Sequence, residues 1–212
     1  MNYLASGKLG DFIHSMIVCK YKFEQTGEPA DIFLSEVGYA FEFDLNFTLK
    51  ELQPVLCVQP WFNSINIYDN QPIDIDLTTW RQSPNLYKTN WLEIYSYEYL
   101  NGVKLPYEYS WISIEKDKQY ENSLMINRSL KTIDDSKLYM YNDMISKYDN
   151  VYFLCFDIKQ YYQFPLHYKT KLIQVTNLFD FFQKIASCKH FIGNQSGPFA
   201  WASAMNINRS VE

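Results

Sequence analysis

The stretch Ser6-Gly7-Lys8-Leu9-Gly10-Asp11-Phe12-Ile13-His14-Ser15 lies between a short apolar run, 3–5, and an amphipathic run that reaches Gly27. This order predicts a strand, a glycine-containing loop and a helix. The glycines allow the backbone a positive φ and a close approach to a ligand or to another loop. Asp11 falls in the first turn of the predicted helix, near its positive dipole end. Its carboxylate either caps the helix or faces a cleft above the sheet, and the spacing leaves both interpretations open.

The same order of strand and helix recurs along the chain. Strands or extended segments are predicted at 30–35, 64–68, 72–77, 124–127, 151–156, 172–175, 191–192 and 208–211. One helix is predicted to start at 49, because Thr48 begins a capping-box pattern, and it contains Pro54. Further helices are predicted at 91–100, 136–148, 178–187 and 198–205. Such alternation predicts an α/β chain in which parallel sheets form twice.

A second glycine loop, Gly193-Asn194-Gln195-Ser196-Gly197-Pro198, follows the strand predicted at 191–192 and opens the last helix. The polar passage 115–122 separates the two series of strands and is predicted to be a linker. We therefore expect an N-terminal domain, 1–114, and a C-terminal domain, 123–212. Helix N-termini at the carboxyl ends of parallel strands bind phosphates, so each loop is a candidate ligand site.

Composition narrows the class of partner. The formal net charge is −5 and the pI is about 5.3, without a basic stripe, which argues against nucleic acid. No apolar run approaches a membrane span, and the N-terminus does not resemble a signal peptide. We expect a cytoplasmic protein without a transmembrane segment, for which peripheral contact with a membrane stays open. Cys19, Cys57, Cys155 and Cys188 lack metal-ligand spacing and are expected to be reduced, buried thiols.

Aromatic residues crowd the stretch from 61 to 111, among them Trp61, Trp80, Trp91, Tyr95, Tyr97, Tyr99, Tyr107, Tyr109 and Trp111. Aromatic rings can stack on the apolar faces of sugar rings. Core and rim packing is the commoner use of such a set, and we favour it here.

The two loops resemble those of a known family. Gly10-Asp11-Phe12-Ile13-His14-Ser15 resembles the Gly-Asp-(Val/Ile)-(Ile/Leu)-His-(Ser/Thr) loop of the ADP-heptose:lipopolysaccharide heptosyltransferases, glycosyltransferase family 9. The stretch 190–198 is similar to their Phe-Ile-Gly-Asn-Asp-Ser-Gly-Pro segment. The resemblance implies a GT-B type fold, with two Rossmann-like domains facing across a cleft. It also implies an inverting, metal-independent transfer of sugar from a nucleotide-sugar to a glycan or glycolipid acceptor, as in polysaccharide biosynthesis, without a further cofactor.

The resemblance also assigns roles to residues. Asp11 matches the general base that deprotonates the acceptor hydroxyl, and His14 lies on the acceptor side. The residues matched to donor binding are Gly10, Arg128, Gln160, Asn194, Gln195, Ser196 and Gly197. Among these, Ser196 and Gly197 correspond to the phosphate-binding loop, Arg128 to the group that neutralises the pyrophosphate, and Gln160 to the group that holds the ribose.

Several departures keep other functions open. Gln195 stands where the family has Asp, Ala200 where it often has His, and Gln160 where it has a carboxylate. Amides hydrogen-bond but carry no charge, so a non-catalytic nucleotide- or glycan-binding protein is the alternative. The chain stops soon after the last predicted strand, so we expect an abbreviated C-terminal part. Asp74-Ile75-Asp76 also matches the Asp-x-Asp of metal-dependent glycosyltransferases, although a half-exposed strand explains the same alternation.

Overall fold

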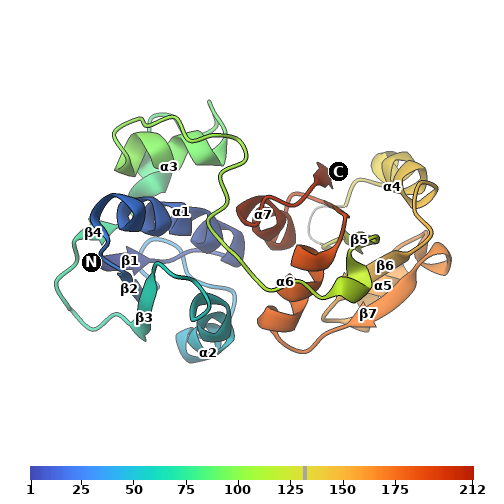
Figure 1. Cartoon of the computed structure of the whole chain (residues 1–212), viewed down its shortest axis with the longest axis horizontal. Coiled ribbons are helices and arrows are strands. Elements are labelled where there is room, and N and C mark those ends of the chain that lie inside the picture. The colour runs from blue at the N-terminus through green and yellow to red at the C-terminus, as the bar shows by residue number, and fades with distance from the viewer. Residues whose placement is uncertain (131–132) are drawn as a thin grey trace. The chain divides into compact units, whose positions relative to one another are not determined.

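Two parallel β-sheets organise the chain (Figure 1). The computed structural model describes residues 1–130 and 133–212 and divides the chain into two units, Met1–Ile112 and Ser113–Glu212. Each unit holds one of the sheets together with its own helices. The prediction of an α/β chain with two parallel sheets is therefore confirmed.

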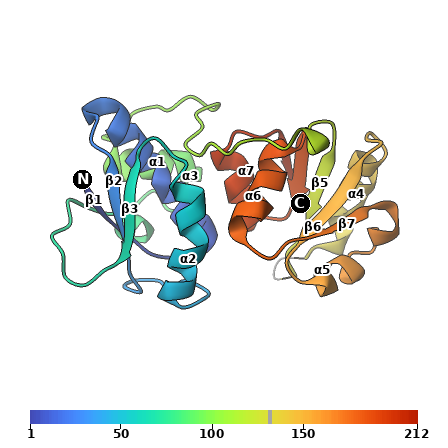
Figure 2. The same ribbon diagram turned by 60° about the horizontal axis from the view of Figure 1, so that its bottom comes forward.

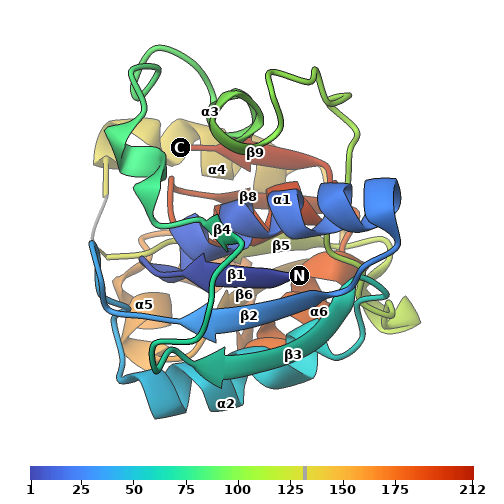
Figure 3. The same ribbon diagram turned by 90° about the vertical axis from the view of Figure 1, so that its left-hand side faces the viewer.

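The first sheet has the strand order β3-β2-β1-β4, which Figure 3 shows with β1 between β2 and β4. Its strands are β1 (Asn2–Ala5), β2 (Ala30–Leu34), β3 (Phe62–Ile67) and β4 (Ile75–Asp76). The helices of this unit are α1 (Leu9–Thr26), α2 (Leu45–Leu56), the 3-10 turn η1 (Thr79–Gln82) and α3 (Trp91–Tyr99). All strand pairs are parallel, so their carboxyl ends lie at one edge of the sheet.

The second sheet has the order β7-β6-β5-β8-β9, again with every pair parallel. Its strands are β5 (Leu124–Asn127), β6 (Val151–Cys155), β7 (Lys171–Gln174), β8 (His190–Gly193) and β9 (Arg209–Val211). Its helices are α4 (Leu138–Ile145), α5 (Ile158–Gln163), α6 (Leu178–Ser187) and α7 (Gly197–Ala204). Three 3-10 turns accompany them: η2 (Lys118–Tyr120), η3 (Asp135–Lys137) and η4 (His167–Lys169). Figure 2 shows α6 and α7 on one side of this sheet and α4 and α5 on the other.

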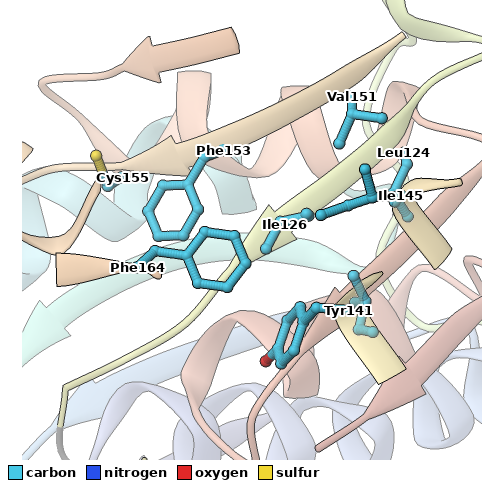
Figure 4. Close-up of a cluster of buried hydrophobic side chains, with 9 residues drawn as sticks. Leu124, Ile126, Tyr141, Ile145, Val151, Phe153, Cys155 and Phe164 are labelled. Atoms are coloured by element: carbon cyan, nitrogen blue, oxygen red, sulfur yellow. The ribbon is translucent and has the colours of Figure 1, made fainter. Parts of the chain in front are cut away.

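The core of the second unit follows from the two-residue period of its strands. Leu124 and Ile126 of β5 share one face with Val151 and Phe153 of β6, and the ring of Tyr141 from α4 packs on them (Figure 4). Phe153 and Phe164 lie with their ring centroids 5.1 Å apart in the same cluster. This apolar face fixes the register of β5 and β6, and the second glycine loop follows β8, the other neighbour of β5.

Three predicted elements differ in their bounds. The helix predicted from residue 49 begins at Leu45, because the carboxylate of Asp44 caps it through the Phe47 N–H at 2.9 Å. Thr48 is instead buried inside that helix, which continues two residues past Pro54. The extended segment 72–77 contributes only the short β4, and the helix predicted at 136–148 is split between η3 and the shorter α4. Helix α5 was not predicted.

The passage 115–122 lies in the second unit of the structure. Asp117 caps η2 through the Gln119 N–H and also accepts a hydrogen bond from Lys184 of α6 at 3.2 Å. Tyr120 is buried. The boundary between the units falls after Ile112, and the assignment of 115–122 as a linker stays a prediction.

Three of the four thiols are buried as expected, but Cys57 is exposed, because it follows the last turn of α2 at the surface. In the part of the chain that the structure describes, none of the helices is long and apolar enough to cross a membrane.

Candidate functional site

The first glycine loop joins the carboxyl end of β1 to α1. Gly7 has a φ of 99°, in the left-handed region that favours glycine, and its N–H donates to the Tyr39 carbonyl at 2.7 Å. A Cβ at Gly7 would lie 3.0 Å from the Cβ of Asp11. The positive φ and this tight approach together favour glycine beside the aspartate. Gly10 lies one turn later, inside α1.

Asp11 has two kinds of partner. Its Oδ2 accepts a hydrogen bond from the Lys8 N–H at 3.2 Å, which satisfies a backbone donor at the start of α1. The same oxygen lies 2.6 Å from Nη2 of Arg81 in an ion pair. The side chain of Asp11 is 14% exposed and that of Arg81 is 35% exposed. Asp11 is therefore a helix cap and, at the same time, an ion-paired carboxylate at the carboxyl edge of the sheet.

Arg81 follows β4, the strand next to β1, and no sequence motif pointed to it. Its guanidinium lies 4.3 Å from the ring centroid of Tyr39 and 4.2 Å from that of Trp80. Tyr39 follows β2, the other neighbour of β1. No sequence signal marked these residues, because only the strand order brings the loops after β1, β2 and β4 together.

The helix face beyond Asp11 is lined by aromatic residues. The imidazole of His14 stacks on Trp91, with ring centroids 5.7 Å apart and planes within 11°. The hydroxyl of Tyr95 donates to the Asp11 carbonyl at 3.2 Å. Burial, followed by the charge of Asp11, raises the pKa of Tyr95 well above its ordinary value, so it stays a donor. His14, on the predicted acceptor side, is half-buried next to the catalytic candidate.

Seven of the nine aromatic residues named between 61 and 111 are buried or half-buried, as core and rim packing predicts. Trp61, Trp80, Tyr95 and Trp111 are buried. Two of them donate hydrogen bonds inside the unit: Nε1 of Trp61 donates to the Trp111 carbonyl, and Nε1 of Trp111 donates to the Ile13 carbonyl. Tyr97 and Tyr107 are exposed.

The second glycine loop joins β8 to α7. A Cβ at Gly193 would lie 2.6 Å from the Asn127 carbonyl, so the end of β8 requires glycine there. Asn194 is buried and holds the neighbouring loop: it donates to the Ser129 carbonyl at 2.7 Å and accepts from the Ser129 N–H at 3.0 Å. Ser196 precedes α7, Gly197 begins it, and Pro198 fits its first turn. Gln195 is exposed in the same loop. This loop therefore brings together four of the predicted donor-binding residues, 194–197.

Arg128 lies after β5, beside this loop, but its partners are not the ones we expected. The side chain is 3% exposed, and its guanidinium bonds to Glu212 at 2.5 Å and to Asp135 at 2.9 Å. These hydrogen bonds raise the pKa of Arg128 above its ordinary value, although burial opposes them. The charge of Arg128 is thus neutralised within the second unit. Its contact with a donor phosphate stays a prediction.

Gln160 is half-buried in α5, after β6. Its N–H donates to the Asp157 carbonyl at 2.9 Å, in the first turn of that helix. Gln160 therefore follows the strand next to β5, but in a different loop from 194–197. A role toward a ribose stays a prediction.

Both carboxylates of the Asp-x-Asp pattern accept hydrogen bonds within the first unit. Oδ2 of Asp74 accepts from the Asn2 N–H at 2.7 Å, and Oδ1 of Asp76 accepts from the N–H and hydroxyl of Thr78. Within residues 1–130 and 133–212, no three His, Cys, Asp or Glu side chains form a group that could hold a metal ion.

Comparisons with known proteins relate the whole fold to glycosyltransferases. No protein-family model and no curated protein matches the sequence. The E. coli heptosyltransferase WaaC with ADP-2-deoxy-2-fluoro heptose is 9% identical, with a TM-score of 0.57 over 100% of this chain and 88% of that chain. A glycosyltransferase family 9 structure from Veillonella parvula is 10% identical, with a TM-score of 0.59 over 99% of this chain and 79% of that chain.

The iron-containing dodecameric glycosyltransferase TibC from enterotoxigenic E. coli is 12% identical, with a TM-score of 0.55 over 99% of this chain and 56% of that chain. At these identities the likeness concerns the fold. The chain therefore has the α/β fold, with two parallel sheets, that these heptosyltransferases and glycosyltransferases share.

Proposed function

We propose that this protein is a glycosyltransferase of the GT-B type that moves a sugar from a nucleotide-sugar to a glycan or glycolipid acceptor. The observation that carries the proposal is the whole-chain likeness of its fold to glycosyltransferases, with a TM-score of 0.57 to WaaC and 0.59 to the Veillonella parvula structure. Two of the similar structures are described with ADP or an ADP-heptose analogue bound. A nucleotide-sugar is accordingly the donor class that we propose for this chain.

The reaction that we propose is an inverting displacement. The acceptor hydroxyl oxygen attacks the anomeric carbon as the bond from that carbon to the phosphate oxygen breaks. The proton of the hydroxyl passes to the carboxylate of Asp11, and the nucleoside diphosphate leaves with the bonding electrons. Asp11 supports this role because it lies at the carboxyl edge of its sheet, where α/β proteins bind ligands, and is partly exposed. His14 would border the acceptor.

Donor binding is assigned to the second loop. Backbone N–H groups at the N-terminus of α7, near Ser196 and Gly197, together with the helix dipole, favour a phosphate there. Asn194 keeps this loop bonded to Ser129, while Gln195 and Gln160 offer uncharged hydrogen-bonding groups. We propose that neither a metal ion nor a further cofactor is needed. A reducing, cytoplasmic compartment fits the four free thiols.

The test is a donor screen. Purified protein is incubated with ADP-, GDP- and UDP-sugars, with and without glycan acceptors, and released nucleoside diphosphate and transferred sugar are both measured. We expect slow hydrolysis of one donor class, accelerated by an acceptor. Asp11→Asn serves as the matched control that removes the proposed base. Equal turnover by this variant would contradict the mechanism, and absence of turnover with every donor would contradict the function.

One observation favours a second candidate, a non-catalytic nucleotide- or glycan-binding protein. The only cation that we had matched to the donor pyrophosphate, Arg128, is bonded to Glu212 and Asp135. The leaving diphosphate would then have less positive charge to stabilise it. Nucleotide binding in titration calorimetry without turnover in the donor screen would favour this candidate.

A further inference from the structure

The carboxylate of Asp11 is held asymmetrically. Both of its hydrogen bonds, from Nη2 of Arg81 at 2.6 Å and from the Lys8 N–H at 3.2 Å, go to Oδ2. Among residues 1–130 and 133–212, no donor is bonded to Oδ1. A carboxylate oxygen has two lone pairs, so Oδ1 is the oxygen of Asp11 that is left to accept a proton.

Arg81 is itself held in place by two rings. The rings of Tyr39 and Trp80 both lie against the guanidinium, with centroids 4.3 Å and 4.2 Å from its central carbon. Trp80 is buried, and the Tyr39 carbonyl accepts the Gly7 N–H of the catalytic loop at 2.7 Å. A guanidinium is planar and stacks on aromatic faces, so these two contacts restrict how the Arg81 side chain can turn.

We infer that Arg81 is a positioning residue: it fixes Oδ2 of Asp11 so that Oδ1 faces the acceptor hydroxyl as the proton-accepting atom. The inference rests on the proposed function. Two donors on one oxygen restrict rotation of the carboxylate, and a misplaced catalytic group costs about 10²-fold in rate. Solvent screens this ion pair on the side of Arg81, which is 35% exposed, and so limits its contribution to folding.

Three variants and one small molecule separate this role from others. Arg81→Ala removes the guanidinium from the rings of Tyr39 and Trp80. Arg81→Lys keeps the positive charge but loses the planar group that stacks on them. Asp11→Asn/Arg81→Ala removes both partners. Guanidinium chloride at low, non-denaturing concentration supplies the missing group. Lys147→Ala, which removes an exposed ion pair with Asp143, is the matched control. Circular dichroism confirms that each variant is folded.

We expect Arg81→Ala to lower kcat by about 10²-fold while the KM for the donor changes less than about twofold, because positioning acts on the chemical step. Arg81→Lys should lose less than Arg81→Ala. Guanidinium should restore part of the rate of Arg81→Ala and none of the rate of the double variant. In the Asp11→Asn background, Arg81→Ala should have almost no further effect, since residues that act through one another are not additive.

Three results would overturn the inference. Wild-type kcat in a folded Arg81→Ala variant would mean that Oδ2 needs no partner. An equal fold-loss in the wild-type and Asp11→Asn backgrounds would mean that Arg81 acts on substrate directly. A rise in donor KM alone would assign Arg81 to donor binding. In each case the wild-type protein still transfers sugar and the proposed function stands, whereas an inactive wild type overturns both.

Discussion

The guanidinium of Arg128 donates hydrogen bonds to both carboxylate oxygens of Glu212, with Nε 2.9 Å from Oε2 and Nη2 2.5 Å from Oε1. The two side chains are 3% and 2% exposed. The Tyr141 hydroxyl and the Asp134 N–H donate to the same carboxylate at 2.9 Å and 2.8 Å. This pair ties the segment after β5 to the end of the sheet at β9, so the charge of Arg128 is used inside the second unit.

Removing one partner of this pair should destabilise the protein. Arg128→Ala leaves the Glu212 carboxylate buried without its main counter-charge, which costs about 3–5 kcal/mol in comparable pairs. The double variant Arg128→Met/Glu212→Met should recover much of that loss, because it leaves no unpaired charge. Urea unfolding measures the free energy of unfolding of the single and the double variant. The control is Lys147→Ala, which removes the exposed pair with Asp143 and should change that free energy by less than about 1 kcal/mol. A similarly small effect of Arg128→Ala would contradict the prediction.

The same pair predicts how stability depends on pH. Burial raises the pKa of Glu212, but hydrogen bonds from Arg128, the Asp134 N–H and Tyr141 outweigh it, so the pKa lies below its usual 4.5. A carboxyl group with a lowered folded-state pKa stabilises the fold above its unfolded value and loses that contribution as the pH falls through the folded value.

Wild type should therefore lose more stability than Glu212→Gln between about pH 5 and pH 3. Thermal unfolding followed across this range gives the difference between the two proteins. Parallel curves for wild type and Glu212→Gln would show that the Glu212 carboxylate does not carry this pH dependence.

Asp11→Asn should slow sugar transfer by about 10²–10⁴-fold, the usual cost of a lost general base. The amide keeps the size of the side chain and accepts from Lys8 as the carboxylate does, so the start of α1 should persist. Donor affinity should be nearly unchanged, because Asp11 is not among the residues assigned to the donor. Initial rates and a donor titration test both statements. If the variant transfers sugar at the wild-type rate, Asp11 only caps α1 and pairs with Arg81.

Chelation should leave transfer and donor binding intact. The phosphates are assigned to N–H groups at the N-terminus of α7, and Asp74 and Asp76 already accept hydrogen bonds from Asn2 and Thr78. Rates are compared before and after EDTA, with manganese added back to the treated sample. Activity that disappears with EDTA and returns with manganese would transfer the catalytic assignment to a metal site at Asp74 and Asp76.

Local chemistry explains why many elements could be predicted. The bounds of β5 (Leu124–Asn127) and α6 (Leu178–Ser187) match the prediction, the latter because Asn177 caps its helix through the Asp180 N–H. The start of α2 could not be predicted correctly, since both Asp44 and Thr48 have the chemistry of a cap. Burial of Thr48 in the folded unit decides between them.

The sequence by itself determined the two series of alternating strands and helices, the two glycine loops, and the position of Asp11 in the first turn of α1, because each depends on neighbours within a few residues. Tertiary structure alone decided the partners of the charged groups. Arg81 reaches Asp11 across 70 positions, and Arg128 reaches Glu212 across 84. Such pairs depend on which strands lie side by side, and strand order is set by packing of the whole sheet rather than by any local pattern.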